Sequence, residues 1–120
     1  MTRPASARID LQALRHNFSR VRQAAPASRI MAIIKANAYG HGTVEVARAL
    51  PDAAAFGVAC VEEAIALREA GFDRRIVLLE GLFSADDVDL IHAYRLDVVV
   101  HHDSQLDLME RFRAARPVDV

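Results

Sequence analysis

The sequence has 120 residues, of which 52% are apolar and 26% charged, and its formal net charge is −1. It contains no block of like charge that would attract nucleic acid or an anionic membrane. Its apolar runs are far shorter than the roughly 18 residues that a transmembrane helix needs. Residues 1–8 lack the apolar core of a signal peptide, and the single cysteine, Cys60, excludes an intrachain disulfide. These features predict a cytoplasmic α/β protein.

Capping signals predict where the helices begin and end, and the first helix precedes the first strand. The expected helices are one from the N-cap Asp10 to just before Pro26, one entered near Thr43, one from Val61 to Gly71, one started by a capping box of Ser84 and Asp87, and one capped by Asp103 that carries Leu106, Met109, Phe112 and Ala115.

Apolar strand candidates begin near Ile30, Ala55, Ile76 and Leu96, with helical stretches between them. A strand and a helix thus recur about every 20 to 25 residues, and eight such units form a TIM-type (β/α)8 barrel of about 250 residues. Residues 118–120 resemble the opening of a fifth strand. We therefore expect the N-terminal half of a TIM-type barrel, with four βα units and the start of a fifth strand.

The run Ile30 to Ile34 is apolar on both faces, which favours a strand covered on both sides of a parallel sheet. It delivers Lys35 to the carboxyl end of the strand, where ligands bind in α/β folds. An aldehyde cofactor with a phosphate needs an amine for a Schiff base, a phenol such as Tyr39 or backbone N–H groups near the phosphate, and an apolar wall. Gly40 and Gly42 allow a turn with positive φ after the lysine. An ordinary solvated lysine is the alternative interpretation.

The nine residues from Ile34 to Gly42, IKANAYGHG, resemble the pyridoxal-phosphate attachment signature of the alanine racemases. Further similarity extends along nearly the whole chain. It includes Ile9-Asp10-Leu11, Phe56-Gly57-Val58-Ala59, Glu62-Glu63-Ala64, Leu67-Arg68 and Ile76 to Gly81.

This resemblance implies an isomerase that interconverts L-alanine and D-alanine with pyridoxal phosphate, for peptidoglycan or for alanine catabolism. It implies that Lys35 is catalytic and holds the cofactor, that Tyr39 contacts the phosphate, and that Ile33 and Leu79 lie beside the ring. It also implies a homodimer in which a tyrosine of the partner subunit is the second base. That tyrosine, and an arginine near the ring nitrogen, would lie beyond Val120. No metal is expected.

Members of this family are much longer, with a barrel followed by a β-rich domain. Residues 1–120 are therefore interpreted as an incomplete N-terminal cofactor-binding barrel domain, without the rest of the barrel and the C-terminal β domain, and inactive alone. Two alternatives stay open. One is a pyridoxal-phosphate-binding homeostasis protein that does not racemise, and the other is a non-catalytic half-barrel that associates through its sheet edges.

Other conspicuous residues have simpler interpretations. The cluster His101-His102-Asp103 is a poor metal site, because adjacent strand residues point to opposite faces. Glu62 and Glu63 open a helix, where negative charge is stabilising. Cys60 is expected to be a small core residue, and His41 is expected to orient the turn through a hydrogen bond.

Overall fold

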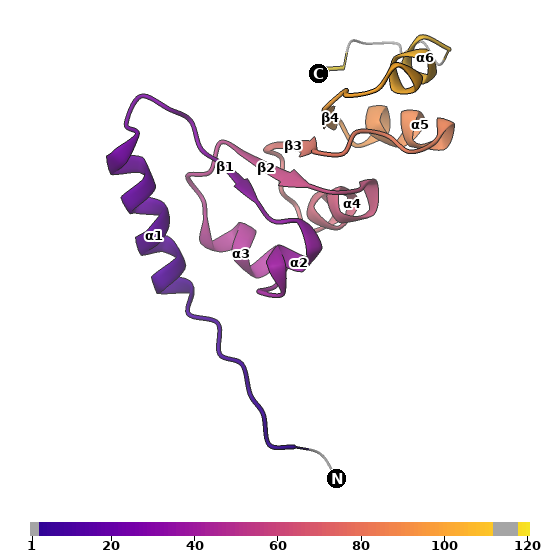
Figure 1. The fold of residues 1–120 in the computed structure, drawn as a ribbon. Helices are drawn as coiled ribbons and strands as arrows, with labels where there is room; N and C mark the ends of the chain where they lie inside the picture. Colours follow the sequence, from indigo (N-terminus) through magenta and orange to yellow (C-terminus); the bar gives the residue numbers. More distant parts are fainter. Residues whose placement is uncertain (1–2, 112–117) are drawn as a thin grey trace.

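Parallel strands alternate with helices along the chain, as the sequence predicts. The computed structural model describes residues 3–111 and 118–120. Within these residues four strands pair in chain order, and each pairing is parallel (Figure 1). The elements are α1 (Leu11–Ala24), β1 (Met31–Ile33), α2 (Lys35–Tyr39), α3 (Thr43–Ala49), β2 (Ala55–Val58), α4 (Val61–Glu69), β3 (Arg75–Leu78), α5 (Ala85–Ala93), β4 (Asp97–Val98) and α6 (Asp103–Arg111).

One face of the sheet is buried under helices. Figure 1 shows α3 and α4 on the same side of β1 and β2. Because side chains alternate between the faces of a strand, every second residue of each strand joins this core. The strand residues Phe56, Val58, Ile76, Leu78 and Val98 are all fully buried.

The opposite face of the sheet is open, and here the expectation of a strand covered on both sides is wrong. Met31 and Ile33 of β1 are exposed, as is Val99 after β4. A pocket of about 300 Å³ lies on this face, between Met31, Val77 and Val120 among others. The helices among the described residues cover only one face of the sheet. The apolar side chains of β1 on the other face therefore stay exposed.

Most of the predicted helix boundaries are confirmed. Asp10 caps α1, because its Oδ1 accepts hydrogen bonds from the backbone N–H groups of Gln12 and Ala13 at 3.0 and 3.1 Å. Asp87 accepts from the N–H of Ser84 at 3.1 Å, within the expected capping box. No helix in the described part of the chain is long and apolar enough to cross a membrane.

The start of α6 differs from the prediction. Asp103 is the first residue of this helix rather than its cap. The preceding residue, His102, takes the capping role, because its Nδ1 accepts from the N–H of Ser104 at 3.1 Å. A histidine ring nitrogen can replace a carboxylate as acceptor, which the sequence pattern did not indicate. Phe112 and Ala115, which were expected on the same helix, lie outside the described residues.

Residues 118–120 lie beside β4, at the position expected for a fifth strand. The carbonyl of Asp119 accepts from the N–H of Val98 at 3.0 Å, although no strand is formed there. Arg75 forms ion pairs with Asp97, at 2.8 Å, and with Asp119. These contacts continue the sheet in the direction that the sequence predicts.

A single guanidinium joins the loops that flank β3 and β4. Arg68 donates to the carbonyl oxygens of Phe72 and Arg74 at 2.7 Å, of Tyr94 at 2.8 Å and of Arg95 at 3.0 Å. Burial, and then the positive charge of Arg95, lower the pKa of Arg68 below its ordinary value. This side chain ties the second βα unit to the two that follow it.

Candidate active site

Lys35 lies two residues after the end of β1, at the carboxyl edge of the sheet where it was expected. The preceding residue, Ile34, is buried and donates its N–H to the carbonyl of Gly57 at 2.9 Å, which extends the pairing of β1 with β2 to the lysine. The lysine is half-buried. Its ε-amine forms no ion pair or hydrogen bond within the described residues.

The chain after Lys35 forms a left-handed turn. Ala36, Asn37, Ala38 and Tyr39 have φ values of 52°, 55°, 53° and 54°. Left-handed helical backbone is unfavourable for residues with a side chain, by roughly 1–2 kcal/mol each. The sequence correctly indicated positive φ at the two glycines that follow, but not at these four residues. Only Asn37 carried a signal, because asparagine tolerates this conformation.

Two polar side chains of the segment stabilise this turn locally. Asn37 Oδ1 accepts from the N–H of Thr43 at 3.1 Å, which ties the turn to the start of α3. His41 Nδ1 lies 3.1 Å from the carbonyl oxygen of Ala38 and 3.2 Å from that of Tyr39. The prediction that His41 orients the turn is therefore confirmed.

A third interaction comes from a distant part of the chain. Glu63, in the first turn of α4, accepts from the N–H of Ala36 through Oε1 and from the N–H of Ala59 through Oε2, each at 2.7 Å. Its carboxylate therefore connects the turn after β1 with the end of β2. The sequence predicted a stabilising role at the helix start, but not this contact, because the partners are 27 residues apart.

Ile33 and Leu79 converge above a glycine on the open face of the sheet. A Cβ atom at Gly57 would lie 2.7 Å from Cδ1 of Ile33 and 3.3 Å from Cδ1 of Leu79. The two side chains thus fill the space that a larger residue would occupy. Both side chains are apolar and lie next to the end of β1. Tyr39 is 61% exposed at the end of the left-handed turn.

The remaining candidates do not assemble into a site. Cys60 is half-buried just before α4, and burial raises the pKa of its thiol, with the carboxylates of Glu62 and Glu63 acting in the same direction. A backbone hydrogen bond, and then the thiol of Cys60, lower the pKa of Glu62. The described residues contain no group of three or more His, Cys, Asp or Glu side chains that could hold a metal ion.

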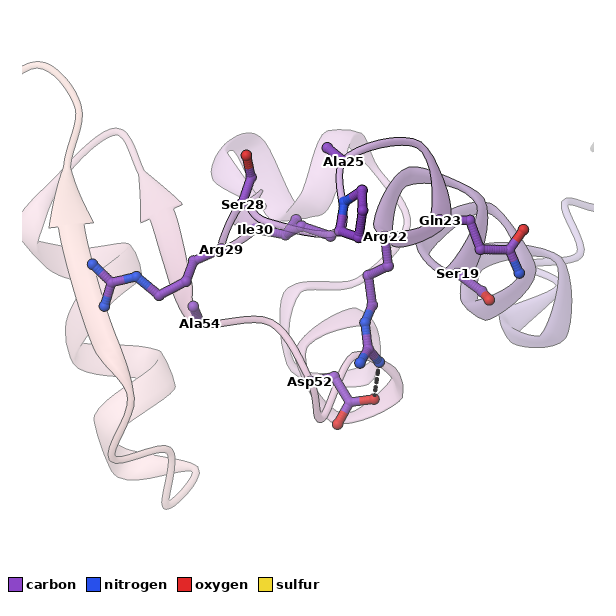
Figure 2. A pocket seen from close by; sticks show the side chains of 10 residues that line it. Ser19, Arg22, Gln23, Ala25, Ser28, Arg29, Ile30, Asp52 and Ala54 are labelled. Carbon is purple, nitrogen blue, oxygen red and sulfur yellow. Dashed lines mark hydrogen bonds and ion pairs between the residues drawn. The ribbon is translucent and has the colours of Figure 1, made fainter.

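A pocket lies at the opposite end of the sheet from Lys35. It has a volume of about 540 Å³ and separates the end of α1 from the start of β1, and Arg22 forms an ion pair with Asp52 across it at 2.7 Å (Figure 2). Ligand sites of parallel α/β folds lie at the carboxyl ends of the strands, whereas this pocket is at their amino ends. We assign it no chemistry.

A lysine at the carboxyl edge of parallel βα units stands where ligands bind in (β/α)8 barrels. The sequence matches the family described as alanine racemase, N-terminal domain, over residues 9–120, and the chain belongs to this family.

Individual relatives agree with this assignment. A biosynthetic alanine racemase of Escherichia coli O6:H1 is 53% identical over 116 residues, which are 97% of this chain and 32% of that protein. The structure of a biosynthetic alanine racemase from Pseudomonas aeruginosa superposes with a TM-score of 0.88 at 41% identity, over 92% of this chain and 31% of the other. A histidine racemase from Leuconostoc mesenteroides superposes with a TM-score of 0.76 at 28% identity, over 84% and 27%. The chain spans about a third of the length of the curated relatives it matches.

Proposed function

We propose that these residues are the N-terminal barrel part of a cytoplasmic, homodimeric alanine racemase that uses pyridoxal phosphate and supplies D-alanine for peptidoglycan or serves alanine catabolism. The observation that carries the proposal is the position of Lys35. It is the only lysine of the sequence, it stands at the carboxyl end of β1, and a left-handed turn holds the segment that follows it. The 53% identity to a biosynthetic alanine racemase supports the same reaction.

The residues present fit this cofactor. Lys35 offers an amine without an ion pair among the described residues, and Ile33 and Leu79 offer an apolar surface suited to the side of a planar ring. Because Gly57 lacks a side chain, both residues can close over that position. Tyr39 offers an exposed phenol for the phosphate.

When bound, pyridoxal phosphate supplies an electron sink that stabilises negative charge at the α-carbon of an amino acid. Lys35 would attach the cofactor covalently and, once the substrate amine has displaced it, exchange a proton with one face of that carbon. Racemisation requires proton exchange on the other face as well. We assign that step to a second base outside residues 1–120, a tyrosine of the partner subunit.

The experiment uses the longest reading frame that contains residues 1–120, hereafter the full reading frame. The purified protein is mixed with pyridoxal phosphate, reduced with borohydride and digested for peptide mass spectrometry. We expect one pyridoxyl adduct, at Lys35, and conversion of L-alanine to D-alanine on a chiral column. An adduct at any other amine of the full reading frame, without one at Lys35, would reject the proposal.

The substrate is tested on the same preparation. Because a histidine racemase shares the fold of this segment, the identity of the amino acid must be measured directly. We expect a higher kcat/KM for alanine than for histidine, serine or lysine. A preference for another amino acid would retain the cofactor assignment and replace the substrate.

A further inference from the structure

We propose that Glu63 is a positioning residue for Lys35, which fixes the backbone that carries the reactive amine. The inference rests on the proposed function of Lys35. It concerns a carboxylate in a different βα unit, at the start of the helix that follows β2.

The contact acts on the peptide unit of the lysine itself. The N–H of Ala36 belongs to the planar group that also contains the carbonyl of Lys35, so a bond to that N–H fixes the plane and with it the ψ angle of Lys35. The second oxygen of Glu63 is anchored on Ala59, directly after β2. Both bonds are 2.7 Å long, as expected when the acceptor is charged.

The turn needs such an anchor because its backbone is strained. Four residues with positive φ follow Lys35, and each favours a right-handed conformation when it is unconstrained. The bonds of Asn37 and His41 stay within residues 37–43 and hold the turn together internally. Among the described residues, Glu63 provides the side-chain hydrogen bond that fixes the turn to the rest of the sheet.

The neighbouring Glu62 provides a matched control. Both glutamates lie in the first turn of α4, so both interact favourably with the helix dipole. Glu62 is exposed and its side chain interacts with the thiol of Cys60, whereas Glu63 is half-buried and reaches Ala36. The same Glu-to-Gln change at the two positions therefore alters charge equally, and only at position 63 does it replace one of the two oxygens that accept from the N–H groups of Ala36 and Ala59.

The test compares the wild type, Glu63→Gln and Glu62→Gln in the full reading frame, each titrated with pyridoxal phosphate. The readouts are the absorbance of the lysine adduct at about 420 nm and its dependence on pH. In Glu63→Gln the new side-chain amide would place an N–H₂ group against one of two backbone N–H donors. For Glu63→Gln we expect the lysine adduct to form about 10-fold more weakly and the pH midpoint of its absorbance to shift. For Glu62→Gln we expect an affinity within about 2-fold of wild type and an unchanged pH midpoint.

Each outcome decides between the proposals. If Glu63→Gln lowers the unfolding midpoint while adduct affinity and its pH midpoint match those of Glu62→Gln, Glu63 is only structural and the inference fails. If the wild type forms no adduct at Lys35, the proposed function fails instead. Glu63→Asp, which keeps the charge but shortens the reach, is the second variant and should show an intermediate loss.

A measurement on the wild type covers the case in which neither variant folds. The amide protons of Ala36 and Ala59 should titrate in NMR spectra with one common midpoint, since both face the same carboxylate. Two independent midpoints, or no titration, would show that Glu63 does not connect them.

Discussion

A methyl group at position 57 tests whether Ile33 and Leu79 form the apolar wall of the proposed site. The Cβ of Gly57→Ala would meet Cδ1 of Ile33 at 2.7 Å and Cδ1 of Leu79 at 3.3 Å. Both distances are shorter than the optimum of about 3.5–4.0 Å for carbon atoms. The contacts are the ends of side chains, and Ile33 is exposed, so both can rotate away. We expect the free energy of unfolding to fall by about 1 kcal/mol, at the low end of the range for overpacking.

The same rotation should have a larger effect on the cofactor, because it displaces both wall residues. We expect the affinity for pyridoxal phosphate to fall about 10-fold, which corresponds to about 1.4 kcal/mol. Gly81→Ala is the contrasting variant. Gly81 has φ +75°, and a Cβ there would lie 2.5 Å from the backbone oxygen of Val99. Since that oxygen cannot rotate away and left-handed backbone is unfavourable for alanine, we expect a loss of about 3 kcal/mol.

The wild type, Gly57→Ala and Gly81→Ala are compared in the full reading frame. Urea denaturation measures the free energy of unfolding, and titration with pyridoxal phosphate measures the affinity for the cofactor. Wild-type affinity of Gly57→Ala for the cofactor would show that Ile33 and Leu79 do not form a wall of the site. An equal loss of stability in Gly57→Ala and Gly81→Ala would show that the two side chains do not rotate away.

Four further predictions follow from the same structure. In the full reading frame, Lys35→Ala should abolish the adduct absorbance at about 420 nm, because it removes the amine that the proposal assigns to the cofactor. Tyr39→Phe should weaken cofactor retention by about 0.5–3 kcal/mol in an equilibrium titration, the range for one hydrogen bond to a charged partner. Residues 1–120 expressed alone should not racemise alanine, and the exposed Met31, Ile33 and Val99 should cause association in size-exclusion chromatography. Cys60 should react with iodoacetamide more slowly at pH 8.5 than a cysteine in a short peptide, because a raised pKa reduces the thiolate fraction at that pH.

Each of these has a clear contrary result. An adduct that persists in Lys35→Ala would exclude Lys35 as the attachment point, and unchanged affinity in Tyr39→Phe would remove Tyr39 from the phosphate site. Turnover by residues 1–120 alone would show that the second base lies within them. Alkylation of Cys60 at the rate of the peptide would show that its thiol is not shielded.

Sequence periodicity was sufficient for the fold but not for the details of the site. The strands near Ile30, Ala55, Ile76 and Leu96 were predictable because apolar runs and capping residues are local signals. Lys35 was predictable because its position depends only on where one strand ends.

The left-handed turn and its anchor were not predictable, since they depend on packing between units. Ala36 and Ala38 carry no preference for positive φ, and the contact between Ala36 and Glu63 is set by how the second βα unit lies against the first. The open face of β1 could not be predicted either. An apolar pattern indicates that a face can be buried, but not which residues bury it.

The contacts of Arg68 imply that the parts of this sheet respond differently to ionic strength. The ion pair of Arg22 with Asp52, and those of Arg75, lie at exposed positions, where dissolved salt screens the attraction. Arg68 instead bonds neutral carbonyl oxygens in a partly buried position, where counterions have little access. Concentrated salt should therefore weaken the ion pairs of Arg22 and Arg75, while the loops before β3 and β4 that Arg68 holds keep their geometry.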